Sequence, residues 1–158
     1  MGVSTAARKL LCDILRTNYP LVLDADALNL IARHADLRDD LIVRRAPTVI
    51  TPHPGEAARL LGADIADRTE SALQLAQELH CSVVLKGAGS ICVGRDGKAR
   101  INRTGNAGMS APGMGDVLAG MIGAFIAQGL EADQALLLAV HLHGAAGDAL
   151  AEQGVKPA

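Results

Sequence analysis

The glycine-rich stretch GNAGMSAPGMGDVLAGMIGAFIAQG, residues 105–129, is the part of the sequence whose residue types most directly suggest chemistry. Gly113 and Gly115 allow backbone N–H groups to turn toward one point, an arrangement that binds anions. The apolar run after them predicts a helix, whose N-terminus favours negative charge. Phosphate is therefore the guest that this loop suits best. A tight turn before a closely packed helix remains an equal alternative, because glycine runs alone are weak signals.

Asp116 places a carboxylate at the start of this helix, where it would repel a bound anion. It is either an N-cap of the helix or a general base that takes a proton from a hydroxyl while the oxygen attacks phosphorus. Spacing alone favours the N-cap. The loop lacks the GKS or GKT ending of a Walker loop, and no GxGxxG follows the first apolar run.

Polar residues follow three short apolar runs. Apolar and polar residues do not alternate within these runs, a pattern typical of strands buried on both faces. The runs are PLVLDAD, PTVIT and CSVVLKG, residues 20–26, 47–51 and 81–87. They end at Asp24, Thr51 and Lys86. Ligands of open α/β sheets bind outside the carboxyl ends of the strands, so we expect these three residues to meet beside the glycine-rich loop.

Helical spacing separates these runs and predicts an α/β layered domain with a parallel sheet. The predicted helices cover residues 4–17, 27–35, 56–62, 69–80, 115–127 and 131–152. Ser4 or Thr5, Thr69 and one acid of DAD are the expected N-caps, and Gly62 is the expected stop. SICVGRDGKARIN, residues 90–102, predicts a hairpin that turns at Asp96-Gly97.

Composition limits the class of protein. The chain of 158 residues suits one domain, with 49% hydrophobic residues. Tyr19 and Phe125 are the only aromatic residues, which argues against a single-strand nucleic-acid platform. Scattered charges with a net charge of −2 predict neither a nucleic-acid nor a membrane partner. Three cysteines without CxxC spacing predict a reduced, cytoplasmic protein.

Each of the other candidate residues also fits a purely structural role. Lys86 in LKGAGS would bind phosphate or be a solvated loop charge. Glu56 in TPHPGE would act chemically or be an acid favoured by the helix dipole, and a lone histidine such as His53 is more often structural. His141 and His143 are two residues apart on a predicted helix, so they point to different faces and are not read as metal ligands.

Four stretches together resemble the ADP- or ATP-dependent NAD(P)H-hydrate dehydratases. They are PLVLDADALNLIA, VITPHPGEAARLLG, VVLKGAGS and the glycine-rich stretch, in the order of that family and over nearly the whole chain. The resemblance implies a ribokinase-like α/β/α fold with a mostly parallel sheet. It also implies repair of NADH and NADPH hydrated on the nicotinamide ring. ADP or ATP, with Mg²⁺, would phosphorylate the hydroxyl, and phosphate would leave.

The resemblance also implies roles for individual residues. Asp116 matches the base that activates the substrate hydroxyl. The implied anion hole is Gly113, Met114 and Gly115; the implied nucleotide contacts are Lys86, Gly87, Ala88, Gly89, Ser90 and Gly115; the implied substrate contacts are His53, Asp24, Asn29 and Asp116. Glu56 would act through magnesium-bound water, and Asp26 matches the motif without an assigned role.

The sequence departs from the family pattern in two ways. Ala111 and Pro112 replace the small hydroxyl residue and the glycine common there, and Pro112 removes one N–H. The chain also begins after the family's N-terminal glycine-rich turn and stops at GVKPA, so we expect residues 1–158 to be a single partial domain. An exposed sheet edge and exposed apolar helix faces would then favour a homo-oligomer.

Three functions compete at this stage. The first is the dehydratase, and the second is a ribokinase-like kinase of a small molecule such as a vitamin, which shares the glycine-Asp loop. TPHPGE together with DADALN favours the dehydratase. The third is a fragment that binds a nucleotide without turnover.

Overall fold

The computed structural model describes residues 2–154, which form one five-stranded sheet in the order β1-β2-β3-β4-β5. The strands are β1 (Leu21–Leu23), β2 (Thr48–Ile50), β3 (Ser82–Leu85), β4 (Ile91–Val93) and β5 (Ala99–Ile101). The first three pair in parallel, and β4 runs antiparallel between β3 and β5. Only β4 is reversed in this sheet, so the prediction of a mostly parallel sheet is confirmed.

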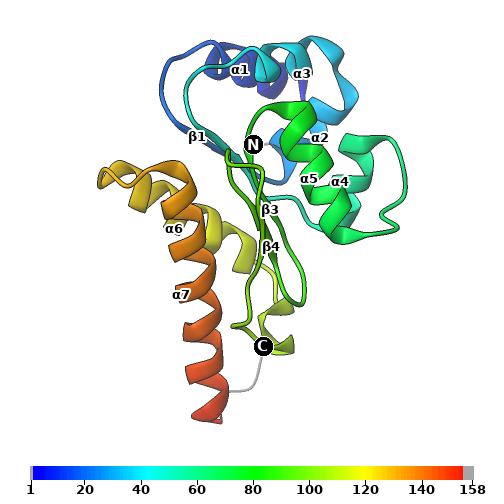
Figure 1. Ribbon diagram of the computed structural model, residues 1–158. Helices are drawn as coiled ribbons and strands as arrows, with labels where there is room; N and C mark the ends of the chain where they lie inside the picture. Colours follow the sequence, from blue (N-terminus) through cyan, green and yellow to red (C-terminus); the bar gives the residue numbers. More distant parts are fainter. Residues whose placement is uncertain (1, 155–158) are drawn as a thin grey trace.

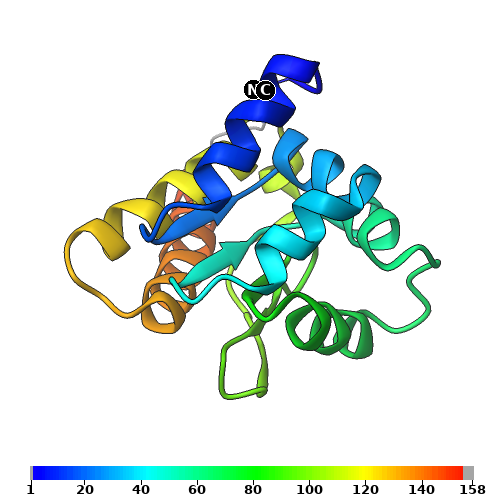
Figure 2. The ribbon, with the colours of Figure 1, turned by 90° about the horizontal axis from the view of Figure 1, so that it is seen from above.

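Helices cover both faces of the sheet and give three layers (Figures 1 and 2). On one face lie α1 (Thr5–Leu15), α2 (Asp26–Arg33), α3 (Ala35–Ile42), α4 (Pro54–Leu61) and α5 (Arg68–Leu79). On the other face lie α6 (Met114–Ala127) and α7 (Ala132–Glu152), preceded by the short 3₁₀ helix η1 (Ala107–Ser110). This arrangement confirms the predicted three-layer α/β/α class.

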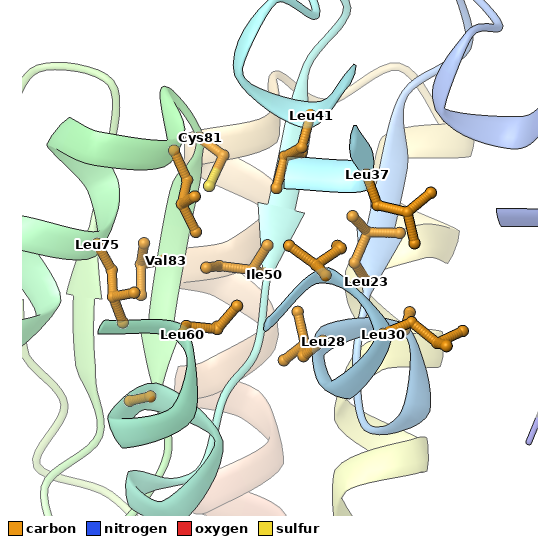
Figure 3. Close-up of a cluster of buried hydrophobic side chains, with 14 of the residues drawn as sticks. Leu23, Leu28, Leu30, Leu37, Leu41, Ile50, Leu60, Leu75, Cys81 and Val83 are labelled. Carbon is orange, nitrogen blue, oxygen red and sulfur yellow. The ribbon is translucent and has the colours of Figure 1, made fainter. Parts of the chain in front are cut away.

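The pleat of the strands separates two hydrophobic cores. Ile50 and Val83 face α1 to α5, in the larger core that Figure 3 shows. Their neighbours Val49 and Val84 face α6 and α7. Because consecutive strand residues point to opposite faces, a strand covered on both sides needs apolar residues throughout. This explains why the strands are continuous apolar runs in the sequence.

Two helix ends match the sequence-based expectations. The Ser4 side chain accepts a hydrogen bond from the N–H of Ala7 and caps α1. Gly62 ends α4 in the left-handed conformation, with φ 67°. The 90–102 segment forms the expected hairpin of β4 and β5, in which Gly97 N donates to Gly94 O.

Three details of the helices were not predicted correctly. The Asp67 side chain, not Thr69, caps α5. Neither acid of DAD caps α2, which begins at Asp26 after Ala25 and has no side-chain cap. The sequence pattern also missed α3 altogether. This helix is rich in charged residues, and its buried face consists of two leucines one turn apart, Leu37 and Leu41.

Strand β1 pairs on one side only within the described residues and is an edge of the sheet. Tyr19, Pro20 and Val22 line a shallow hollow beside it, together with Gly123, Ile126 and Ala127 of α6.

Within residues 2–154, none of the helices combines the length and the apolarity needed to cross a bilayer.

Candidate active site

The carboxyl ends of β1, β2 and β3 meet at one point, as the sequence predicted. The Lys86 ammonium after β3 lies 2.8 Å from Oδ1 of Asp24 after β1. The backbone N–H of Lys86 donates to the carbonyl of Pro52, after β2, at 2.8 Å. Lys86 therefore ties the three motifs DAD, TPHPGE and KGAGS into one cluster.

The first turn of α6 lies directly against this ion pair. A Cβ atom added to Gly115 would come within 3.3 Å of Lys86 Nζ and 3.4 Å of Asp24 Oδ2. Gly113 is the N-cap residue in a left-handed conformation, with φ 88°, and provides no side-chain cap. The first N–H groups of a helix have no partners inside the helix, so this end of α6 is available to an anion.

Asp116 is the third residue of α6, so the N-cap interpretation that spacing favoured is wrong. The left-handed Gly113 begins the helix three residues earlier than a cap at Asp116 would require. The Asp116 carboxylate is exposed and forms no hydrogen bond or ion pair with the residues that the structure describes. Its oxygens are therefore free to accept a proton from a bound molecule.

His53 and Glu56 form the capping box at the start of α4. His53 Nδ1 accepts from Gly55 N at 3.0 Å, and Glu56 Oε2 accepts from His53 N at 2.8 Å. Glu56 is buried, and its Oε2 lies 3.9 Å from Lys86 Nζ. Glu56 thus has the helix-start role that was one of its two alternatives, and the same carboxylate also contributes negative charge beside Lys86.

Arg68 organises the loop from Lys86 to Ser90, and sequence reasoning missed it. Its guanidinium, at the first residue of α5, donates to the carbonyls of Ala88 at 2.7 Å and Gly89 at 3.3 Å. A Cβ on Gly87 would lie 2.7 Å from Arg68 Nη2. The arginine therefore packs against the loop at a residue that has no side chain. Gly87 and Gly89 have φ values of 146° and 64°, which favour glycine.

These elements surround one cleft of about 640 Å³. The predicted site residues that line it are His53, Lys86, Gly87, Ala88, Gly89, Ser90, Met114 and Gly115. Asp24, Asn29, Glu56, Gly113 and Asp116 are not among its lining residues, although Asp24 and Glu56 contact Lys86 and Asp116 follows Gly115. Asn29 is half-buried in α2.

Helix α7 forms the opposite wall of the cleft, and the sequence analysis predicted no site residue there. Thr104 Oγ1 donates to the carbonyl of His141 at 2.9 Å, and a Cβ on Gly144 would lie 2.2 Å from the same Oγ1. The Asp148 carboxylate accepts from Gly105 N at 2.8 Å and from Asn106 Nδ2 at 3.0 Å. These two hydrogen bonds lower the pKa of Asp148, the backbone N–H contributing most.

The glycines of HLHGAAGD, residues 141–148, were the available signal for this wall. They let α7 approach the 104–109 segment closely, since a Cβ on Gly147 would also collide with Met109.

The described part of the chain holds no cluster of metal-binding side chains, and two of its cysteines are buried. Among residues 2–154, no group of three His, Cys, Asp or Glu side chains could hold a metal ion. Burial raises the pKa of the Cys81 and Cys92 thiols to about 12. Both are buried residues of the hydrophobic core.

Residues 1–156 match the sequence profile of the NAD(P)H-hydrate dehydratases. The ADP-dependent (S)-NAD(P)H-hydrate dehydratase of Neisseria meningitidis is 41% identical over 159 residues, which cover 96% of this chain and 53% of the relative. The bifunctional NAD(P)H-hydrate repair enzyme Nnr of Thermofilum pendens is 42% identical over 158 residues, covering 97% of this chain and 30% of the relative. This chain therefore spans between about a third and a half of these curated relatives.

Solved structures agree with the fold. The ADP/ATP-dependent NAD(P)H-hydrate dehydratase of Bacillus subtilis, co-crystallized with ATP/Mg²⁺, superposes with a TM-score of 0.82 at 29% identity, covering 97% of this chain and 54% of that one. An ADP complex of Bacillus subtilis pyridoxal kinase gives a TM-score of 0.60 at 18% identity, covering 88% of this chain and 58% of that chain, and shows the fold alone.

Proposed function

Because the chain belongs to the NAD(P)H-hydrate dehydratase family, we propose that it carries out the ADP-dependent dehydration of hydrated NADH and NADPH. One observation carries the proposal: Lys86, the KGAGS loop and the N-terminus of α6 all line the same cleft. A lysine, exposed loop N–H groups and a helix N-terminus are the groups that proteins use to bind phosphates.

The nucleotide would lie along the segment from Lys86 to Ser90, with its terminal phosphate at Gly113, Met114 and Gly115. Arg68 holds the first segment in shape by its bonds to the carbonyls of the loop. The second segment presents the open end of α6, where the absence of a side chain at Gly115 leaves room for Lys86 and Asp24. Both segments are thus ordered before a ligand arrives, which lowers the entropic cost of binding.

Asp116 would be the general base. It would take the proton of the substrate hydroxyl as that oxygen attacks the terminal phosphorus of ADP, and AMP would leave. Loss of phosphate from the ring, with loss of the neighbouring proton, would then restore the double bond. The substrate would lie near His53, Asp24 and Asn29, on the β1 and β2 side of the cleft.

Magnesium fits the charges of this site as a companion of the phosphates. Asp24 and Glu56 lie within 3.9 Å of Lys86, so two carboxylates outweigh one ammonium before any phosphate enters. When bound, Mg²⁺ would supply the positive charge that neutralises the phosphates, and it usually takes one or two carboxylates with several waters. Glu56 would hold one of those waters. Chelation of magnesium should weaken ADP binding at least tenfold, measured by titration calorimetry with and without EDTA.

We expect the protein to be a cytoplasmic homo-oligomer without nucleic-acid or membrane partners. The open side of β1 and the exposed side chains of Val117, Leu138 and Leu142 support an association of subunits. Light scattering tests this, and a monodisperse monomer at micromolar concentration would contradict it.

The decisive assay follows recovery of NADH absorbance from NADH hydrate after addition of ADP and magnesium. The 158-residue chain is compared with the Neisseria meningitidis relative as a full-length control. Recovery by this chain, with one AMP and one phosphate formed per NADH, supports the dehydratase. A stable phosphorylated product would identify a kinase instead, and binding of ADP without turnover would identify a nucleotide-binding fragment.

A further inference from the structure

His143 is an unexplained polar residue in the α7 wall of the cleft. Its side chain is half-buried and lines the cleft beside Gly144. Its Nε2 atom is buried and has no hydrogen-bond partner among the described residues. Native structures leave few buried polar atoms unpaired, and those that remain commonly await a ligand or water.

The imidazole of His143 is suited to neutral recognition. Burial lowers the pKa of His143, so the ring is uncharged at neutral pH. A neutral imidazole offers one donor and one acceptor nitrogen. An ionised phosphate offers acceptors only and is bound more strongly by the charged Lys86, whereas a heterocyclic base carries matching donors and acceptors at its edge.

The surroundings of His143 also suit a base better than a phosphate. The cationic and helix-N-terminal groups of the cleft belong to Lys86 and Gly115. Around the α7 wall, the lining residues include Met109, Leu118 and Val140, which are apolar. Ligand sites commonly combine such apolar walls with a few polar groups that fix orientation.

We propose that His143 hydrogen-bonds the base of the bound nucleotide and makes this site prefer adenine over guanine. The inference rests on the proposed nucleotide site and adds its base specificity. Adenine and guanine carry opposite groups at the 6-position, an amine donor and a carbonyl acceptor. In a given tautomer, the ring nitrogen that faces the base is either a donor or an acceptor, so it pairs with one of these two groups and not with the other. Rotation about the Cβ–Cγ bond, which has a broad torsional well, turns Nε2 toward the ligand.

The first test compares ADP with GDP, which share the ribose and the diphosphate. Dissociation constants are measured by calorimetry for the parent chain, His143→Leu and the matched control His141→Leu. His141 lies on the same helix but is exposed and does not line the cleft. We expect His143→Leu to lose ADP affinity roughly three- to tenfold, the size of one neutral hydrogen bond. GDP affinity should change less than twofold, and His141→Leu should match the parent.

A second measurement uses the unaltered chain, so it does not depend on the folding of a variant. Imidazole ¹⁵N resonances are followed by NMR during titration with ADP. The Nε2 resonance of His143 should move as ADP binds, while the resonances of His141 stay in place.

The outcomes separate this inference from the nucleotide site itself. If the parent chain binds neither ADP nor ATP, the proposed function fails and the base contact fails with it. If it binds ADP and GDP equally well, the nucleotide site stands and the inference is overturned. Equal losses of ADP and GDP affinity in His143→Leu, or an unmoved Nε2 resonance, would also overturn it.

Discussion

Replacing Gly144 by alanine should separate α7 from the segment that begins the glycine-rich loop. The added Cβ would lie 2.2 Å from Thr104 Oγ1, 2.7 Å from Thr104 C and 2.8 Å from Thr104 O. The hydroxyl can rotate away, but the backbone carbonyl cannot, so one element must move by a few tenths of an ångström. That movement strains the hydrogen bond from Thr104 to the carbonyl of His141.

The magnitude follows from opposing terms. Overpacking costs about 1–3 kcal/mol, and the strained hydrogen bond adds about 1 kcal/mol. Alanine offsets up to about 1 kcal/mol of this through its better helix propensity. We therefore expect Gly144→Ala to lower the free energy of unfolding by about 1–3 kcal/mol. ADP affinity should fall as well, because Thr104 and Gly144 both line the cleft.

Gly120→Ala is the matched control. Gly120 is an exposed residue inside α6, and a Cβ there would have no neighbour within 4 Å. The substitution should raise the free energy of unfolding by about 0.5–1 kcal/mol and leave ADP affinity unchanged. Urea titrations of the parent and both variants provide the measurement. A Gly144→Ala variant as stable as Gly120→Ala would refute the close packing of α7 against Thr104.

Three further predictions concern the cleft. Asp116→Asn should reduce turnover at least a hundredfold while the dissociation constant of ADP stays within twofold; unchanged turnover would exclude Asp116 as the base. Arg68→Met should weaken ADP binding several-fold by releasing the KGAGS loop, whereas Arg103→Met, at an exposed arginine with no hydrogen bond to the described residues, should bind like the parent. The folded-state pKa of Asp148 is lowered, so the hydrogen bond that its carboxylate accepts from Gly105 N is fully formed above about pH 4 and is lost as the pH falls through the folded pKa. The Gly105 amide proton shift in NMR should therefore stay constant above that pH and move only below it; movement between pH 6 and 5 would contradict this assignment.

The strands and their shared edge could be predicted because burial on both faces leaves a direct mark on the sequence. Val49 and Ile50 face different cores, so each must be apolar. Parallel pairing then places Asp24 and Lys86 at one edge without any knowledge of their side chains. The observed 2.8 Å contact between them is a consequence of that topology.

The residues that hold the loops in place could not be found in the same way. Arg68 contacts Ala88, which is 20 residues away, and Asp148 contacts Gly105, 43 residues away. No local pattern of either residue reports its distant partner. Asp116 shows a different limit: the spacing allowed both a cap and a base, and only the left-handed conformation of Gly113 fixed where α6 begins.

The charges around Lys86 explain why three elements must meet before this site can work. Asp24 holds the ammonium at 2.8 Å, and the buried Glu56, itself fixed by the capping box, lies 3.9 Å away. A lysine on a flexible stem would otherwise sample many positions, and each would cost entropy on binding. The two carboxylates place it under the first turn of α6, where Gly115 leaves room for it. The negative charge that fixes Lys86 also opposes a phosphate, so the site gains precise placement at the expense of affinity. This electrostatic repulsion is strongest for phosphates that are not accompanied by a cation.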